Sequence, residues 1–267
     1  MKKLTLIVGL VCSGFVVLVA LVSLVWTPFD PTKVSTHRYG GLSWPHILGT
    51  DGLGMDTASR LMTGAQTTLL VGILAVGIAA VIGVPLGIYV GMGHKMLGEV
   101  VARASDILYA LPALLLAILL AAAVGASVMT ATVAIGIATI PIFQRMARAA
   151  TLTVMSQDYI LAAEVAGTPR FIIALRHILP NIAPLLGVQA AASFSMAILA
   201  EAGLAYLGLS APQAVPAWGR MLRDADIYTA PGQAVIPGIA IAVAVMGFNL
   251  LGDGVRDYLD PRLREVR

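Results

Sequence analysis

Ionisable side chains are few in this 267-residue chain, and most of them stand between long apolar runs. Glu201 is an acid near the end of such a run, and Gln189 and Ser193 precede it in the same run. An ionisable group inside a membrane helix is costly unless it is paired or wetted, so these three residues are candidates for a polar pathway or gate. The alternative is a helix that ends earlier and leaves Glu201 at the membrane interface.

A second group of polar side chains lies in the segment 46–72, which reads HILGTDGLGMDTASRLMTGAQTTLLVG. Asp51 and Asp56 can hold its glycine-rich turns by hydrogen bonds, and Arg60 is placed to pair with either carboxylate. This pattern predicts a fixed polar shelf, a docking face for another protein, or both. The segment lacks the D-x-[DN]-x-[DN]-G spacing of a calcium loop, which argues against a metal site.

Residues for nucleotide hydrolysis or nucleophilic catalysis are not found in the sequence. The phosphate-binding pattern G-x-x-x-x-G-K-[ST] is absent, because Gly93-His94-Lys95 has neither the spacing nor the hydroxyl residue. The 4 histidines are scattered, and a single cysteine, Cys12, allows no disulfide within the chain. We therefore expect no catalytic residues, no metal site and no cofactor in this chain.

The composition indicates a membrane protein built from helices. Hydrophobic residues make up 58% of the chain and charged residues 12%, with a mean hydropathy of +0.90, whereas soluble domains are about 25% charged. The net charge of +3 is too small to favour nucleic acid as a partner. A spanning helix needs about 20 apolar residues, and the apolar runs predict six spans, near 4–26, 66–92, 106–124, 128–147, 182–207 and 232–252. The first run is longer than a signal peptide's apolar core and lacks a cleavage site, so we expect it to be retained.

The distribution of basic residues predicts the orientation of these spans. With a cytoplasmic N-terminus, most of the 17 Lys and Arg residues fall on the cytoplasmic side, and the exceptions are Lys33, Arg38, Arg60, Arg220 and Arg223. This bias satisfies the positive-inside rule. It places both termini and the segment 159–179 in the cytoplasm.

The segment 159–184, YILAAEVAGTPRFIIALRHILPNIAP, is neither a span nor an ordinary loop. Small residues at Ala162, Ala163, Val165 and Ala166 make one helical face, and Gly167-Thr168-Pro169 then breaks the helix. A second amphipathic run follows from Arg170 to Leu179, and Pro180 is expected to open the next element. Two short helices at an angle would suit insertion into a groove on another protein.

This segment resembles the cytoplasmic loop of the membrane subunits of binding-protein-dependent ABC importers. Their pattern is E-A-A, three residues, Gly, nine residues, Ile-x-Leu-Pro, and Ala162-Ala163, Gly167 and Leu179-Pro180 match it in spacing. Leu161 replaces the Glu and His177 the Ile. Further blocks at 46–66, 201–222 (EAGLAYLGLSAPQAVPAWGRML) and 248–262 (FNLLGDGVRDYLDPR) resemble one subfamily, the second membrane subunit of dipeptide, oligopeptide and nickel importers.

The resemblance implies an all-α membrane protein with six transmembrane helices of the type I ABC importer fold. It implies a first helix and extracytoplasmic segment over 1–65, the importer domain over 66–254 with a coupling loop at 156–180, and a cytoplasmic tail over 255–267. It assigns ATPase docking to Ala162, Ala163, Glu164, Gly167, Thr168, Pro169 and Arg170. It assigns binding-protein docking to Asp51, Asp56, Arg60, Trp218 and Arg220.

The implied partners are a related second permease, two ABC ATPase subunits that bind the ATP and Mg²⁺, an extracytoplasmic substrate-binding protein and the lipid of a bacterial inner membrane. The implied function is peptide import by alternating access, with nickel or another small solute as the alternative. A self-sufficient secondary transporter also has several spans, but it would be expected to show coupled charges in mid-span and discontinuous helices.

Overall fold

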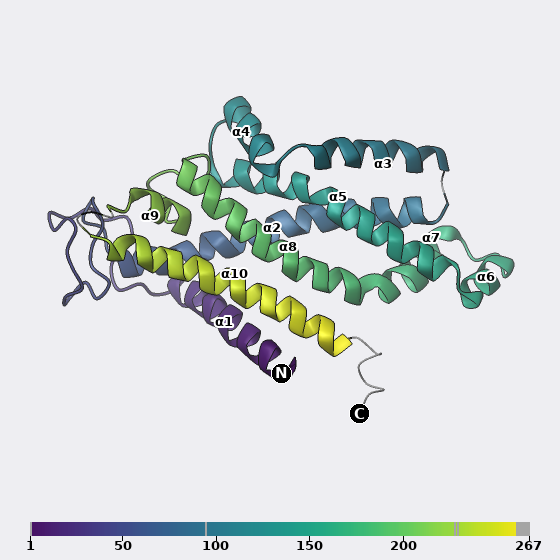
Figure 1. Cartoon of the computed structure of the whole chain (residues 1–267), viewed down its shortest axis with the longest axis horizontal. Coiled ribbons are helices and arrows are strands. Elements are labelled where there is room, and N and C mark those ends of the chain that lie inside the picture. The colour runs from purple at the N-terminus through teal and green to yellow at the C-terminus, as the bar shows by residue number, and fades with distance from the viewer. Residues whose placement is uncertain (1, 94, 227, 229, 260–267) are drawn as a thin grey trace.

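The computed structural model describes residues 2–93, 95–226, 228 and 230–259, and within these ranges the regular structure is helical. Figure 1 shows long helices lying along one axis, with α6 at one end and α9 at the other. The elements are α1 Lys2–Ser23, α2 Thr57–Gly91, α3 Lys95–Ala110, α4 Ala113–Val124, α5 Val128–Met155, α6 Asp158–Val165, α7 Arg170–Ile173, the π-helical turn η1 Ala174–Ile178, α8 Leu179–Leu207, α9 Trp218–Asp224 and α10 Gly232–Leu259.

Within the described ranges, five helices are long and apolar enough to cross a membrane, or six segments if a sharply bent pair is counted as one span. The five match the spans expected near 4–26, 66–92, 128–147, 182–207 and 232–252. Helix α2 has 35 residues and is longer than expected. It begins at Thr57, nine positions before the expected start at 66, because Asp56 caps it there. Helix α10 runs on to Leu259, so the expected tail begins within this helix, and residues 260–267 lie outside the described residues.

The span expected at 106–124 is not one uninterrupted helix. Helix α3 ends at Ala110, α4 begins at Ala113, and the two are bent by 87° at the break. Pro112 causes the break, since the residue before a proline leaves the helical region and proline itself cannot donate to the preceding turn. Helix α4 has 12 residues, a length of about 18 Å, which is shorter than the roughly 30 Å hydrocarbon core.

Pro180 stands at the start of α8, as expected, but no break in the helical run precedes it. Helices α7, η1 and α8 form one continuous helical run over Arg170–Leu207. The π-turn admits the proline: the N–H of Leu179 bonds to the carbonyl of Ala174, five residues back. This wider turn shifts the register just before Pro180, where an ordinary helix would place the ring against a carbonyl.

Glycines on α2 are used to pack against α5 within the chain. A Cβ at Gly83 would lie 2.7 Å from the carbonyl oxygen of Ile140, and one at Gly87 would collide with the carbonyl of Gln144. Gly91 faces Thr151 in the same way. Gly83, Gly87 and Gly91 are therefore occupied by packing within the chain, as small residues in membrane helices permit.

Helix α10 lies alongside α1 and joins it to the rest of the bundle (Figure 1). A Cβ at Gly254 would lie 2.8 Å from the Cα of Leu6, and one at Gly247 would lie 2.8 Å from the Cβ of Cys12. On its other side Gly252 approaches Ala191 of α8. Ala191 of α8 thus packs against α10 within the chain.

Candidate functional site

Helix α6 projects from one end of the molecule and is closed by a glycine turn (Figure 1). The N–H of Gly167 bonds to the carbonyl of Glu164 at 2.9 Å, and the N–H of Thr168 bonds to that of Ala163 at 3.0 Å. Gly167 has a φ of +73°. This is a Schellman motif, in which a left-handed residue lets the chain reverse and satisfies the last carbonyls. The expected break at Gly167-Thr168-Pro169 is confirmed.

The outward face of α6 is small and partly apolar. Val165 is 91% exposed, and Ala162 and Glu164 are also exposed. Ala163 instead lies half-buried against the chain's own apolar core. Beyond the turn Pro169 and Arg170 are exposed and Thr168 is half-buried. The residues assigned to ATPase docking therefore lie together around one turn, and most offer their side chains to solvent.

This projecting turn is anchored to the helix bundle by buried isoleucines. Ile160, Ile173 and Ile178 are fully buried in a cluster with Ile88 of α2 and Phe143 of α5. The hydroxyl of Tyr159 also accepts a hydrogen bond from the side chain of Asn181 at 3.2 Å. These anchors connect α6 to α8 by direct contacts as well as through the chain.

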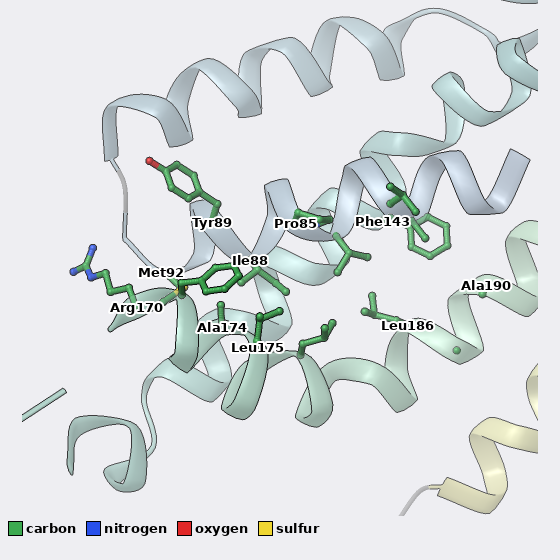
Figure 2. Close-up of a pocket in the computed structure, with 16 residues that line it drawn as sticks. Pro85, Ile88, Tyr89, Met92, Phe143, Arg170, Ala174, Leu175, Leu186 and Ala190 are labelled. Atoms are coloured by element: carbon green, nitrogen blue, oxygen red, sulfur yellow. The ribbon is translucent and has the colours of Figure 1, made fainter. Parts of the chain in front are cut away.

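Beside this anchor lies an apolar groove of about 920 Å³ between α2 and the run α7–η1–α8. Figure 2 shows Ile88 and Met92 on one side, Leu175 and Leu186 on the other, and Phe143 at the inner end. The guanidinium of Arg170 points away from the groove at its edge. Because α7 and α8 form one wall, any movement of the 156–180 segment changes the width of this groove.

The three pathway candidates all lie on α8, and two of them are buried. Gln189 is half-buried and donates to the Ser193 hydroxyl at 3.0 Å. Glu201 is 1% exposed and accepts a hydrogen bond from Ser210 at 3.2 Å. Helix α8 continues to Leu207, so the helix does not end before Glu201. Ser193 and Glu201 face the interior of this chain, and Gln189 alone of the three reaches a partly open surface.

At the opposite end, residues 24–56 and α9 form a compact layer that we call the shelf (Figure 1). Asp56 caps α2: its Oδ2 accepts from the Ser59 N–H at 2.8 Å and the Ser59 hydroxyl at 2.7 Å, and its Oδ1 lies 2.8 Å from Nδ1 of His46. Within the shelf the Thr32 hydroxyl and N–H donate to Asp30 and lower the pKa of that carboxyl. Asp56 therefore fixes both the start of α2 and the loop before it.

Arg60 lies near the start of α2, beneath the shelf, and is 2% exposed. Its Nε lies 3.5 Å from Oδ2 of Asp51, and its other nitrogens donate to the carbonyls of Pro31 at 3.3 Å and Gln213 at 3.5 Å. Asp51 in turn accepts from the N–H groups of Leu53 and Met55, both at 2.9 Å. Arg60 pairs with Asp51 rather than with Asp56, and it connects three segments that are distant in sequence.

The residues assigned to binding-protein docking are brought together, but not all at a surface. Trp218 is buried and donates from Nε1 to the carbonyl of Leu61 at 2.8 Å. Arg220 pairs with Asp224 one turn later at 2.8 Å, and both side chains are partly exposed. Asp56, Arg60 and Trp218 thus support the shelf from within, because their side chains are enclosed, whereas Asp51 and Arg220 reach its surface.

Sequence reasoning missed several residues that hold the shelf. His46 had been interpreted as an ordinary polar surface residue, yet it pairs with Asp56. Gln233 at the start of α10 donates to the carbonyl of Thr50, and the Thr67 hydroxyl donates to that of Pro216 at 2.8 Å. For the first pair the sequence did offer a signal, because His46 and Asp56 belong to the same motif block. The other two pairs are separated by more than a hundred residues, and nothing in the local sequence indicates them.

Comparison with known proteins places this geometry in context. Residues 83–265 match the model of the family described as binding-protein-dependent transport system inner membrane component. The dipeptide transport system permease protein DppC of Alkalihalophilus pseudofirmus is 38% identical, over 98% of this chain and 88% of that protein. The di/tripeptide transport system permease protein DppC of Pseudomonas aeruginosa is 41% identical, over 82% of this chain and 73% of that protein. The glutathione transport system permease protein GsiD of Pectobacterium atrosepticum is 36% identical, over 95% and 87%.

A solved structure shares the fold. A chain of the methionine ABC transporter MetNI, in an inward-facing conformation, superposes with a TM-score of 0.60 over 75% of this chain and 97% of its own length, at 20% identity. The type I importer fold expected from the sequence is confirmed at this level. The family match, the extent of the relatives and the spanning helices agree, and the chain belongs to the binding-protein-dependent transport system inner membrane component family, the permease subunits of ABC importers.

Proposed function

We propose that this chain is one of two membrane halves of an ATP-driven importer of di- and oligopeptides. In this proposal it forms half of the translocation pathway and couples closure of partner ATPases to alternating access. The observation that carries the proposal is the projecting, glycine-turned helix α6 anchored to the continuous run α7–η1–α8. The chain offers no nucleotide-binding loop of its own, so ATP and Mg²⁺ belong to the partner ATPases.

The proposed orientation places α6 in the cytoplasm and the shelf outside. Helix α1 begins and α10 ends on the side that points toward α6 (Figure 1). The excess of basic residues on that side supports a cytoplasmic location for both ends. The ATPases would then reach the 156–180 segment, and the substrate-binding protein would reach the shelf.

The proposed coupling is mechanical and follows from the buried anchors. An ATPase that holds the exposed face of α6 moves Ile160 and Ile173, and these side chains pack on α2 and α5. Since α7 and α8 are one helical run, displacement of α6 changes the groove between α2 and α8. A ligand-driven change of state requires contacts that differ between the two states. In this proposal ATP provides such contacts at the ATPases, and the loaded binding protein provides them at the shelf.

The substrate class rests on the relatives. Proteins named as dipeptide, di/tripeptide and glutathione permeases are 36 to 41% identical over most of this chain. All three names describe short peptides. We therefore expect reconstituted complex to import labelled di- or tripeptides, and import of nickel without peptide uptake would contradict the peptide assignment.

Val165→Asp tests the docking role of α6. The side chain is 91% exposed, so the substitution should leave the fold intact and place a charge on the proposed ATPase contact. We expect copurification of the ATPase and substrate-stimulated ATP hydrolysis to fall at least tenfold. Val34→Asp is the matched control, because Val34 is an exposed valine of the shelf; it should leave ATPase binding unchanged. Equal ATPase binding in both variants would contradict the docking assignment.

A further inference from the structure

A small polar space lies where the shelf, α2, α9 and α10 meet. Its volume is about 20 Å³, and its lining comprises Asp51, Thr57, Arg60, Met221, Asp224 and Gln233. A water molecule needs about 10 to 15 Å³ of space measured in this way, together with two to four polar partners. The site meets both conditions for one water and leaves no room for a larger ligand.

Thr57, the first residue of α2, gives independent evidence that the space holds a polar ligand. The residue is 2% exposed, and its hydroxyl has no hydrogen-bond partner among the described residues. Its backbone N–H is already bonded to the carbonyl of Gly49 at 3.1 Å. Buried hydroxyls are nearly always paired, by protein groups or by ordered water. Because Thr57 lines the space, a water there would complete its hydrogen bonding.

We propose that this space binds one ordered water, which accepts a hydrogen bond from the Thr57 hydroxyl and donates to the carboxylates of Asp51 and Asp224. A metal cation fits the site less well. The guanidinium of Arg60 already lies 3.5 Å from Asp51 and also lines the space. Arg220 pairs with the other acid, Asp224. Calcium would need six to eight oxygen ligands, whereas these two acids are already balanced by two arginines.

The water would connect the C-terminal end of α9 to the start of α2. At its first residue α9 is bonded to α2 through Trp218 and Leu61. At its last residue Asp224 bonds to Arg220 of the same helix. A water between Thr57 and Asp224 therefore adds a second connection from α9 to α2, and it holds the exposed Arg220–Asp224 pair in a fixed position relative to the shelf.

Thr57→Val tests the proposal, because the direction of its effect on the melting temperature depends on whether water occupies the space. Valine keeps the shape of threonine and removes the hydroxyl. If the water is bound, the variant loses its hydrogen bond, and the melting temperature of the assembled complex should fall by about 2 to 4 °C. Hydrogen exchange of the α9 amides near Asp224 should also become faster. If the space is dry, removing an unpaired buried hydroxyl should leave the melting temperature unchanged or raise it.

Two control variants distinguish the loss of a bound water from a loss of side-chain packing. Thr151→Val removes another buried hydroxyl without a described partner, but Thr151 lies on α5 and does not line this space, so the variant should leave hydrogen exchange of the α9 amides unchanged. Thr57→Ser keeps the hydroxyl and loses the methyl group, and it should keep the exchange rate of α9. A fall in Thr57→Ser as large as that in Thr57→Val would assign the effect to packing and overturn the proposal.

Two further results would also overturn it. One is an unchanged or raised melting temperature in Thr57→Val. The other is a calcium-dependent rise in the melting temperature of the wild-type complex that Thr57→Val abolishes, since this would identify a cation in place of water. A density map that resolves buried waters elsewhere in the complex should show one peak between Thr57 and Asp224.

Discussion

Gly167 is constrained by its backbone conformation and not by crowding. Its φ is +73°, and a Cβ at this position would meet nothing within 4 Å. The left-handed conformation costs a residue other than glycine roughly 1 to 2 kcal/mol, and this cost hardly depends on the size of the side chain.

Gly167→Ala and Gly167→Leu should therefore have similar effects. Both should loosen the turn after α6 and lower substrate-stimulated ATP hydrolysis by the purified complex, while Gly167→Asn should retain more activity because Asn tolerates the left-handed region. ATP hydrolysis with and without loaded binding protein is the measurement. A much larger loss for Leu than for Ala would show that an ATPase side chain packs against this position.

Arg60 and Arg220 differ in burial, and their substitutions should differ accordingly. Arg60→Ala leaves Asp51 and the carbonyls of Pro31 and Gln213 without their partner. Hydrogen bonds to a charged group contribute about 1.5 to 3 kcal/mol each, so loss of this buried guanidinium should sharply lower the yield of folded complex. Arg220→Ala breaks a partly exposed pair one helical turn apart, worth about 0.3 to 0.5 kcal/mol. Thermal unfolding of both variants is the measurement, and equal losses would contradict this account of the shelf.

At the scale of helices, the close approach of α2 and α5 should depend on one face of α2. Gly87 lies against the backbone of α5, whereas Gly77 on the same helix has open space where a Cβ would stand. Gly87→Val should therefore separate the two helices and prevent folding, while Gly77→Val should be tolerated. Membrane-inserted yield and melting temperature are the measurements. Comparable folding of both variants would mean that the α2–α5 contact is not essential.

Two prolines show how the helices depart from simple spans. Pro112 breaks the chain between α3 and α4, and the two axes differ by 87°. Pro180 is instead accommodated, because the π-turn over Ala174–Ile178 adjusts the register before it. The same residue type thus ends one helix and continues another. The difference lies in the local backbone and in the buried contacts of Ile173 and Ile178, which hold the second run together.

At the scale of the whole molecule, apolar side chains remain exposed on the spanning helices, where lipid or a second permease would cover them. The groove beside α8 and the outer face of α4 expose apolar side chains, among them Leu175, Leu115 and Leu119. The glycine face of α2 is already used within the chain. Contacts with a second permease are therefore expected at these exposed apolar surfaces and not at Gly83, Gly87 and Gly91.

Assembly with a different, related permease should give one copy of this chain per complex. Expressed alone, the chain should be poorly stable and should not transport peptide. Native mass spectrometry of the complex formed with the sister permease and the ATPases is the measurement. A functional complex with two copies of this chain and no sister permease would contradict the heteromeric assembly.

The sequence by itself determined the features that depend on local chemistry. Long apolar runs predicted five of the spanning helices, because the hydrocarbon core sets their length and composition. Gly167-Thr168-Pro169 predicted the turn after α6, because the Gly and Pro backbones restrict that turn locally. The motif blocks indicated the family. Each of these signals lies within a few tens of consecutive residues.

Only the tertiary structure decided which side chains are buried and what they contact. Arg60 reaches Gln213, Gln233 reaches Thr50, and Trp218 reaches Leu61, across separations that no local pattern encodes. The sequence could place Asp56, Arg60 and Trp218 near one end of the bundle, but their exposure depends on how the shelf folds over α2. Helix packing likewise decided that the glycines of α2 meet α5, since burial follows from the positions of all neighbouring helices and not from the residue itself.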